Sequence, residues 1–554
     1  MILTGAQITV EILKEQSVDT VFGYPGGSVL NIFDALYSER RAIRCVCASH
    51  EQGACHAADG YARASGKCGV VIATSGPGAT NLVTALAAAY LDSSPIVAIT
   101  GNVSTASIGK DSFQEVDICS ITMPITKHNY IVKDIRSLAQ TLRNAFAIAQ
   151  SGRCGPVLVD IPKDVAEGEI EFDSSSRADY KFNLPDPPQK DLLYAASKIN
   201  TAKRPVIYAG GGVVAADAYE ELERLSDALC APVACSMMGL TALSSDNPRY
   251  LGLVGMHGIF SATEIIHKCD LLIALGVRFS DRAMINRGLI EKGTEIIQID
   301  IDAAEIDKNM RASCPIVGDI KRIIPLLAAH IRPTPRKMWQ KEHEGILSRS
   351  KTQFDMDFAR LNPQLILERL ADVFPDACVA TDVGQHQMWT AQYFRFRSPR
   401  TFITSGGLGA MGFGMGAAIG ACIACGGRKT LMITSDGSFH MSMGELAAAV
   451  TENLPIVIVL MNNRSLGMVR QLQRVFFDSR FAYTSLNRKT DFAVLAQAMG
   501  AHGIHVEQKD QLDAALEEAK RASSPILLDC TIDPDEMVLP MIPPGGDISE
   551  IILR

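Results

Sequence analysis

The chain has 554 residues, enough for roughly three or four domains. Hydrophobic residues make up 47% of it, which predicts a large buried core, and the net charge of −8 lacks long runs of one sign, which argues against nucleic acid as a partner. The N-terminal segment lacks a signal-peptide pattern and no uncharged apolar run is long enough to span a membrane, so we expect a cytoplasmic protein with no membrane partner.

Strand-like apolar runs alternate with helical patterns, which predicts an α/β fold with parallel sheets. The first unit, 1–168, has such runs at 19–22, 44–49, 69–75, 95–101 and 156–162. The second, 190–330, has them at 204–212, 231–236, 269–276 and 294–302. The third, 358–540, has them at 377–384, 400–407, 429–437, 455–463 and 524–533. The polar segment 171–190 and the charged, partly helical segment 332–345 are predicted linkers.

Two neighbouring runs of the third unit end in hard oxygen donors. Asp436 and Gly437 follow the first, and the second ends in Asn462 and Asn463. Ligands bind at the carboxyl ends of parallel strands, and carboxylate and amide oxygens suit Mg2+, which usually completes its shell with phosphate and water. The pattern therefore predicts a diphosphate held through a metal. The alternative is a plain turn at Asp436 and a helix cap at Asn462.

Four loops that follow strands are rich in glycine: 24–28, 74–81, 209–213 and 405–414. The last contains a formal GxGxxG from Gly407 to Gly412, but it lies mid-domain, so we favour glycines that let the backbone approach a ligand. Loop 209–213 ends the first strand of its unit, and Asp300 ends a later one. That pair could hold the phosphates and ribose of a nucleotide, or the loop could be only a tight strand-to-helix turn.

Glu51 begins a helix directly after a buried strand, in SHEQGA. An acidic residue at a helix start is commonly a surface residue that satisfies the helix dipole. The strand end would also place Glu51 at the ligand edge of the sheet, where a partly buried glutamate could exchange a proton with a heteroaromatic nitrogen.

The fourteen cysteines follow no disulfide framework, and most lie in apolar contexts, so they are expected to be reduced, buried thiols. The one CxxC, Cys422 to Cys425, has no second pair for zinc and is expected to pack in the core.

Eight motifs occur in a fixed order: YPGG, SHEQGA, SGPGATN, DSFQEVDI, DIPKDV, DVGQHQMWTAQ, SGGLGAMGFG and the Asp–Gly to Asn–Asn unit. Together, over nearly the whole chain, they resemble the acetolactate synthase (acetohydroxyacid synthase) large-subunit family of thiamine-diphosphate enzymes. Segments 111–128 and 382–389 are the most specific to that family.

The resemblance implies three doubly wound α/β domains: pyrimidine-binding, middle FAD-binding-type and diphosphate-binding. It implies thiamine diphosphate, Mg2+ and FAD as cofactors, the FAD without a redox role. The site would lie between two chains of a homodimer or homotetramer, and a small regulatory subunit would be a partner. Mg2+ would be held by Asp436, Asn463 and the backbone oxygen of Ser465.

The remaining site residues are also implied by the resemblance. Those lining thiamine diphosphate would be Tyr24, Pro25, Gly26, Gly27, Pro77, Asn81, Val383, Gly384, Gln385, His386, Gly409, Met411, Gly437 and Ser438. Those lining FAD would be Arg153, Gly210, Gly211, Gly212, Met256, His257, Gly276, Arg278, Asp300, Ile301 and Asp319.

The implied activity is that of a transferase: pyruvate is decarboxylated and its two-carbon unit is ligated to a second 2-keto acid, pyruvate or 2-ketobutyrate, in branched-chain amino-acid synthesis. Glu51 would bond the pyrimidine nitrogen of the cofactor, and Gln114 would stabilise a polar intermediate. Phe113 and Met468 would shape the acceptor pocket. Arg282 would pair with a carboxylate, and Lys163 would line the entrance.

Four residues depart from the family pattern. Ser435 replaces a glycine, Gly416 a proline and His440 a glutamine. Leu472 replaces a tryptophan over the acceptor pocket, which predicts a weaker preference for 2-ketobutyrate because leucine lacks the flat indole face.

Two other functions stay open. One is another thiamine-diphosphate enzyme, such as pyruvate oxidase or a 2-keto-acid decarboxylase. The other is a degenerate nucleotide-binding regulatory subunit. Lys163, Gln114 and Arg282 favour the carboligase over the first, and Glu51, Asp436 and Asn463 argue against the second.

Overall fold

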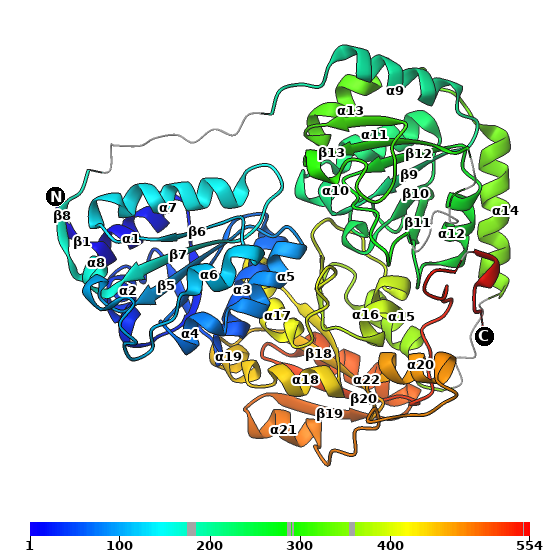
Figure 1. Ribbon diagram of the computed structural model, residues 1–554. Coiled ribbons are helices and arrows are strands. Elements are labelled where there is room, and N and C mark those ends of the chain that lie inside the picture. Colours follow the sequence, from blue (N-terminus) through cyan, green and yellow to red (C-terminus); the bar gives the residue numbers. More distant parts are fainter. Residues whose placement is uncertain (174–183, 285–289, 291–292, 354–359, 547, 554) are drawn as a thin grey trace.

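Three parallel six-stranded sheets organise the chain, one in each of three α/β units (Figure 1). The computed structural model describes residues 1–173, 184–284, 290, 293–353, 360–546 and 548–553. The predicted fold class is confirmed. The boundaries 1–168, 190–330 and 358–540 stay predictions. No helix in the described ranges is both long and apolar enough to cross a membrane.

The N-terminal sheet has the strand order β3-β2-β4-β5-β7-β6. Its strands are β2 (Thr20–Tyr24), β3 (Arg44–Cys47), β4 (Gly69–Ala73), β5 (Ile96–Asn102), β6 (His128–Ile131) and β7 (Val157–Pro162). The helices around it include α1 (Gly5–Glu15), α2 (Leu30–Ser38), α3 (Glu51–Ser65), α4 (Pro77–Thr80), α5 (Val83–Leu91), α7 (Ile135–Gln150) and α8 (Lys163–Glu167). A short antiparallel pair, β1 (Ile2–Thr4) and β8 (Glu169–Glu171), joins the two ends of this unit.

The C-terminal sheet repeats this topology with the order β16-β15-β17-β18-β20-β19. Its strands are β15 (Cys378–Thr381), β16 (Phe402–Ile403), β17 (Thr430–Ser435), β18 (Ile456–Asn462), β19 (His502–Val506) and β20 (Ile526–Thr531). Its helices are α15 (Pro363–Val373), α16 (Gln385–Tyr393), α17 (Phe413–Ala424), α18 (Asp436–Ser442), α19 (Glu445–Thr451), α20 (Gly467–Phe476), α21 (Phe492–Ala498) and α22 (Lys509–Arg521). In both sheets the chain crosses over beside the first strand, which makes that point a ligand-binding crevice.

The middle sheet differs, with the order β11-β10-β9-β12-β13-β14. Counted along the chain this is 3-2-1-4-5-6, the order of dinucleotide-binding sheets. Its strands are β9 (Pro205–Ala209), β10 (Val233–Cys235), β11 (Tyr250–Leu253), β12 (Leu271–Leu275), β13 (Glu295–Asp300) and β14 (Cys314–Val317). The helices are α9 (Gln189–Thr201), α10 (Gly211–Ala215), α11 (Tyr219–Leu229), α12 (Phe260–His267) and α13 (Ile320–Ala328).

The two predicted linkers have different outcomes. Part of 171–190 lies outside the described residues. The segment 332–345 is partly helical, as predicted, because from Lys337 it forms the start of helix α14 (Lys337–Gln353), but it packs against α12 and so is more than a linker. Trp339 is buried there, and its Nε1 donates to the carbonyl oxygen of Pro205 at 3.1 Å. This helix is therefore part of the middle unit's packing.

Candidate active site and nucleotide cavity

The first group of predicted site residues gathers at the crossover point of the C-terminal sheet. Helix α16 begins after Gly384, whose φ of +148° is one that residues with side chains rarely adopt. Helix α18 begins next to it at Asp436, and Ser438 Oγ donates to the carbonyl oxygen of Val383 at 3.0 Å. Two helix N-termini thus open on one crevice, and their free N–H groups suit the phosphates of a ligand.

Asp436 and Asn463 follow strands β17 and β18, which are paired neighbours. Asp436 is 4% exposed, and its Oδ1 has no hydrogen-bond partner among the described residues. Burial raises the pKa of Asp436 to about 6. Asn463 Oδ1 accepts from the N–H of Ser465 at 3.1 Å. A buried carboxylate with an unpartnered oxygen beside an amide oxygen fits a hard cation such as Mg2+.

His386, also predicted here, is buried with no partner at Nε2 among the described residues. Burial lowers its pKa to about 3, so the ring is neutral. Gln385 accepts from Asn463 Nδ2 at 3.3 Å through Oε1 and donates to Gln471 Oε1 at 3.0 Å. These contacts hold the start of α16 against the loop that follows β18.

Glu51 lies at the carboxyl edge of the N-terminal sheet, where α3 begins. It is half-buried, and its Oε2 accepts from Asn81 Nδ2 at 2.9 Å. A Cβ on Gly78 would lie 3.1 Å from Glu51 Oε1, so the glycine leaves room for this carboxylate. The predicted pair Glu51 and Asn81 is thus brought into direct contact, with the second oxygen of Glu51 turned toward loop 74–81.

The backbone of Gln114 packs against the same loop, 74–81. A Cβ on Gly76 would lie 2.8 Å from the carbonyl oxygen of Gln114, and both residues have left-handed φ values, +57° and +58°. Loop 24–27 is joined to this region through Ser28 Oγ, 2.9 Å from Thr74 Oγ1. Glu51, Asn81, Gln114 and the 24–27 loop therefore share one sheet edge.

Several predicted residues at this edge are open to solvent. Phe113 is 87% exposed and Tyr24 is 43% exposed; Pro25, Gly27 and Pro77 are exposed as well. Lys163 begins α8, is half-exposed and lies 3.6 Å from Glu167. Glu51, Phe113, Gln114 and Lys163 are not among the described residues that line the large cavity discussed next.

A cavity of about 1420 Å³ lies where the three units meet. Ligand pockets usually measure about 300–1,000 Å³, so this one has room for an extended molecule. Predicted FAD residues lining it are Arg153, Gly211, Gly212, Met256, His257, Gly276, Arg278, Asp300, Ile301 and Asp319. It also reaches Arg282, Val383, Gly384, Gly409, Met468 and Leu472. The cavity therefore connects the middle sheet with the crevice of the C-terminal sheet.

Gly210 is the exception among the predicted nucleotide residues, because it is not among those lining the cavity. A Cβ there would lie 2.1 Å from the carbonyl oxygen of Gly276, and one on Gly212 would lie 2.6 Å from Gly276 Cα. These glycines let the turns after β9 and β12 touch at the crossover point of the middle sheet. The tight-turn alternative therefore accounts for Gly210 and Gly212, while Gly211 faces the cavity.

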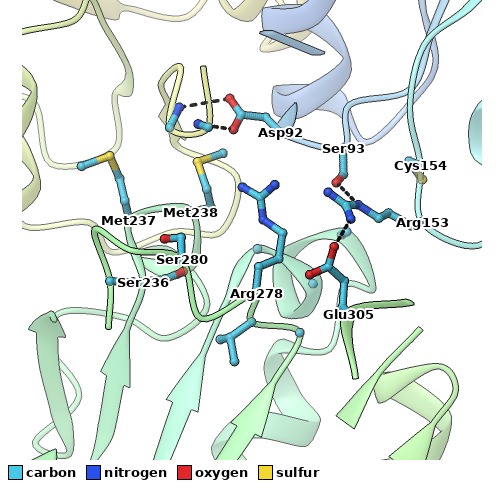
Figure 2. Close-up of a pocket in the computed structure, with 18 of the residues that line it drawn as sticks. Asp92, Ser93, Arg153, Cys154, Ser236, Met237, Met238, Arg278, Ser280 and Glu305 are labelled. Carbon is cyan, nitrogen blue, oxygen red and sulfur yellow. Dashed lines mark hydrogen bonds and ion pairs between the residues drawn. The ribbon is translucent and has the colours of Figure 1, made fainter. Parts of the chain in front are cut away.

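Charged side chains are paired along the cavity wall (Figure 2). Arg153 Nη1 donates to Glu305 Oε1 at 2.6 Å, and Arg153 Nε donates to Ser93 Oγ at 2.8 Å. Glu305 is 4% exposed, and its Oε2 has no partner in the described ranges. Burial raises the pKa of Asp300 to about 6, although its Oδ1 accepts from the N–H of Asp302. Carboxylates on a roomy cavity wall, one of them with an unpartnered oxygen, suit the hydroxyl groups of a sugar.

Four residues lining the cavity were not indicated by the sequence: Asp92, Ser93, Met238 and Glu305. Asp92 and Met238 approach the loop at 405–409 of the C-terminal unit. Ser93 and Glu305 both bond Arg153. Asp92 and Ser93 follow a helix and Glu305 lies in a short 3₁₀ turn, so no strand-end pattern marks them. Only their place in the folded chain brings them to the cavity.

Three departures from the family pattern fit the structure locally. Ser435 has φ −130°, which any residue adopts, and its side chain caps α18 by accepting from the N–H of Ser438. A Cβ on Gly416 would lie 2.5 Å from the carbonyl oxygen of Gly53, so a larger residue would push α17 off α3. His440 lies with Nδ1 2.6 Å from the carbonyl oxygen of Asp436 and Nε2 2.8 Å from Thr490 Oγ1.

Family models for thiamine pyrophosphate enzymes match the N-terminal TPP binding domain at residues 3–121, the central domain at 192–327 and the C-terminal TPP binding domain at 382–530. The chain belongs to the thiamine pyrophosphate enzymes. Thiamine pyrophosphate is the same molecule as thiamine diphosphate, so the predicted cofactor class is confirmed.

Curated relatives place this thiamine pyrophosphate enzyme more closely. It is 43% identical to the acetolactate synthase isozyme 2 large subunit of Escherichia coli, covering 99% of each chain. It is 43% identical to a probable acetolactate synthase large subunit of Methanocaldococcus jannaschii, covering 99% of this chain and 95% of that one. It is 41% identical to the Corynebacterium glutamicum acetolactate synthase large subunit, covering 99% and 90%. The chain belongs with the acetolactate synthase large subunits of its family.

Proposed function

We propose that the chain is the catalytic subunit of an acetolactate synthase. It decarboxylates pyruvate and ligates the two-carbon unit to pyruvate or, less readily, to 2-ketobutyrate. The observation that carries this proposal is the near-complete coverage at 43% identity to an acetolactate synthase large subunit, together with Glu51 bonded by Asn81 at the sheet edge. Thiamine diphosphate supplies the electron sink that lets carbon dioxide leave.

We assign Asp436, Asn463 and the backbone oxygen of Ser465 to Mg2+. The unpartnered, buried Oδ1 of Asp436 supports this assignment. Val383, Gly384, Gln385, His386, Gly437 and Ser438 would face the diphosphate, which the two helix starts at this crevice favour. The metal would offset the negative charge that the phosphates bring to a buried carboxylate.

In this proposal Glu51 exchanges a proton with a ring nitrogen of the cofactor. Asn81 donates to one oxygen of Glu51 and leaves the other free to bond a ring nitrogen. Gln114, whose backbone lies against loop 74–81, would donate from its side-chain amide to an oxygen that gains charge during the reaction. Phe113, Met468 and Leu472 provide apolar surface for the acceptor. Arg282, 71% exposed at the cavity wall, is placed to pair with its carboxylate, and Lys163 stands at the entrance.

We propose FAD as the ligand of the large cavity. The dinucleotide-type strand order, the cavity volume of about 1420 Å³ and the buried acceptors Asp300 and Glu305 support it. The ligation involves no net redox change, so the flavin would stabilise the junction of the three units rather than react.

We propose that a second copy of the chain completes the site, in a homodimer or a homotetramer. Phe113 and Tyr24 support this proposal, because they are exposed at the same sheet edge as Glu51. Exposed apolar side chains next to a functional site commonly mark a surface that another protein chain buries. A small regulatory subunit, a cytoplasmic location and the domain boundaries 1–168, 190–330 and 358–540 belong to the same proposal.

The function is tested by incubating the purified chain with pyruvate, thiamine diphosphate, Mg2+ and FAD, without an added electron acceptor. We expect acetolactate, and we expect Glu51→Gln to lower the rate at least about a hundredfold, the usual worth of a proton-transferring group. Glu11→Gln is the matched control, because Glu11 is a partly exposed residue of α1 that pairs with Lys14, and its change should leave the rate unchanged.

Other products would redirect the function. Acetaldehyde and carbon dioxide without acetolactate would indicate a 2-keto-acid decarboxylase. Acetate with reduced flavin would indicate a pyruvate oxidase. No turnover, even with thiamine diphosphate bound, would favour the degenerate regulatory subunit.

A further inference from the structure

Asp92 is a buried carboxylate outside the cofactor assignments made above. It follows helix α5, its side chain has no exposed surface, and it lies on the cavity wall. Its Oδ2 accepts from the N–H of Gly406 at 3.0 Å and its Oδ1 from the N–H of Gly407 at 2.7 Å (Figure 2). A residue of the N-terminal unit therefore binds a loop of the C-terminal unit by two charge-assisted hydrogen bonds.

Arg63 on helix α3 completes the contact. Its Nη2 lies 3.1 Å from Asp92 Oδ2, it binds both oxygens of Asp59, and its Nη1 donates to the carbonyl oxygen of Thr404 at 2.7 Å. Arg63 is shared between two buried carboxylates, so Asp92 is also stabilised by the positive charge of Arg278 and by the N–H groups of Gly406 and Gly407.

The loop fits this contact only with glycine. A Cβ on Gly406 would lie 2.5 Å from Met238 Sδ, and one on Gly407 would lie 2.9 Å from both Asp92 Oδ1 and Leu91 Cβ. The backbone of Gly406 and Gly407 therefore contacts the Asp92 carboxylate directly, because neither residue has a side chain that would separate them.

The other end of the loop is held by a second buried carboxylate. Asp382 accepts from the N–H of Gly412 at 2.8 Å and from that of Gly414 at 3.3 Å. Gly409 and Met411, which the family resemblance implies as thiamine diphosphate residues and which we include in the proposed cofactor site, lie between the two anchors. Asp92 reaches this segment from the N-terminal unit and Asp382 reaches it from the C-terminal unit.

The neighbours of Asp92 bind the middle unit. The carbonyl oxygen of Leu91 accepts from Arg278 Nη1 at 2.6 Å. Ser93 Oγ accepts from Arg153, which also bonds Glu305. Leu91, Asp92 and Ser93, at the C-terminal end of α5, therefore link the N-terminal unit to both other units, with Ser93 acting through Arg153.

We propose that Asp92 is a positioning residue for the thiamine diphosphate site. It sets the 405–411 loop at the distance from the N-terminal unit at which Gly409 and Met411 meet the cofactor. The inference rests on the proposed assignment of these two residues to the cofactor.

The test compares the wild-type full chain with Asp92→Asn, which keeps the size of the side chain. An asparagine oxygen accepts only one of the two N–H groups, and its amide nitrogen faces the other donor. We expect the Kd of thiamine diphosphate, measured by calorimetry with Mg2+ present, to rise about tenfold or more, a loss typical of one charge-assisted hydrogen bond. At saturating cofactor the rate of acetolactate formation should return to within about threefold of wild type.

The matched control is Asp217→Asn. Asp217 also joins two units, through Arg400 at 2.8 Å, but its side chain is 53% exposed, and its partner lies before β16 instead of being an N–H group of loop 405–411, so its loss should leave the Kd unchanged. If Asp92→Asn does not fold, Gly407→Ala displaces the same contact from the loop side, and the same rise in Kd is expected.

A folded Asp92→Asn protein with a lower melting temperature but an unchanged Kd would overturn the inference, because Asp92 would then be only structural. A wild-type chain that binds thiamine diphosphate but makes no acetolactate would overturn the proposed function and leave the inference on Asp92 standing. Gly409→Ala and Met411→Ala variants that bind thiamine diphosphate as tightly as the wild type would overturn the assignment of these residues and, with it, the inference on Asp92.

Discussion

Burial raises the pKa of three carboxyl groups that follow strands, Asp300, Asp382 and Asp436, each to about 6. An aspartate in water titrates near about 3.9, so at neutral pH each of these groups is held charged in a place that disfavours charge. Asp382 uses its charge to bind the N–H groups of Gly412 and Gly414. Asp300 and Asp436 face sites where a ligand or a metal would compensate them.

Asp300→Asn should stabilise the FAD-free protein at pH 7.5. Because the folded-state pKa lies above the unfolded one, the charge penalty is present above pH 6 and disappears as the pH falls toward 4. The asparagine oxygen still accepts from the N–H of Asp302. Denaturant unfolding should show a gain of about 2 kcal/mol at pH 7.5, shrinking toward zero at pH 4.5. A gain that is equal at both pH values would contradict this explanation.

Leu472 faces the cavity together with Met468, one helical turn earlier on α20. We expect Leu472→Trp to raise the ratio of 2-aceto-2-hydroxybutyrate to acetolactate about fivefold when both acceptors compete, because the indole adds a flat apolar surface worth about 1 kcal/mol. Val469→Trp is the control, since Val469 is 47% exposed on the same helix. An unchanged ratio in Leu472→Trp would remove Leu472 as a specificity determinant.

At the scale of elements, the N- and C-terminal units are joined by the close packing of α3 against α17 (Figure 1). The contact consists of small residues: a Cβ on Gly60 would lie 2.2 Å from the carbonyl oxygen of Ala417, and one on Gly420 would lie 1.8 Å from that of Ala57. Because α3 begins at Glu51 and α17 follows Met411, this contact also fixes the spacing between two predicted parts of the site.

Gly420→Ala should therefore destabilise the protein by about 2 kcal/mol or more, since the added methyl meets backbone and outweighs the better helix propensity of alanine. Gly345→Ala on α14 is the control, because a Cβ there meets nothing within 4 Å. It should leave stability unchanged or raise it by up to about 1 kcal/mol. Thermal melts of the two variants would decide; similar melting temperatures would show that α17 can shift without cost.

At the scale of the whole molecule, the three units meet around one cavity, and hydrogen bonds as well as apolar contacts join them there. Arg153, Arg278 and Asp92 cross between units by hydrogen bonds (Figure 2). The chain beyond α22 adds another link, because the N–H of Ile542 donates to the carbonyl oxygen of Met256 on the cavity wall at 2.9 Å. A ligand in the cavity would touch every unit.

FAD should raise the melting temperature of the chain. At a concentration about 100 times its Kd, a ligand that binds only the folded state adds about 2.7 kcal/mol to stability. Riboflavin, which lacks the phosphates and the adenosine, is the control and should shift the melting temperature much less. Equal shifts with both compounds, or none with either, would contradict the assignment of this cavity to FAD.

The sequence predicted every central strand and two of the six edge strands, β3 and β16, and it missed the other four for a physical reason. The strands it did not indicate in the three sheets, β6, β11, β14 and β19, are all edge strands. An edge strand is exposed along one side, so its residues need not form the continuous apolar run by which buried parallel strands are recognised. His128–Ile131 and Cys314–Val317, for instance, both include exposed positions.

For the site, the sequence by itself determined what is local: the strand-end acid Asp436, the helix-start acid Glu51 and the glycine loops at the crossover points. Such groups are marked because backbone geometry at a strand end allows few residue types. Only the tertiary structure decided which of them meet. Asp92 and Gly406 are 314 residues apart, so no local sequence pattern predicts the hydrogen bond between them. The shared cavity, and the contacts that hold it, come from the packing of three units that each fold by local rules.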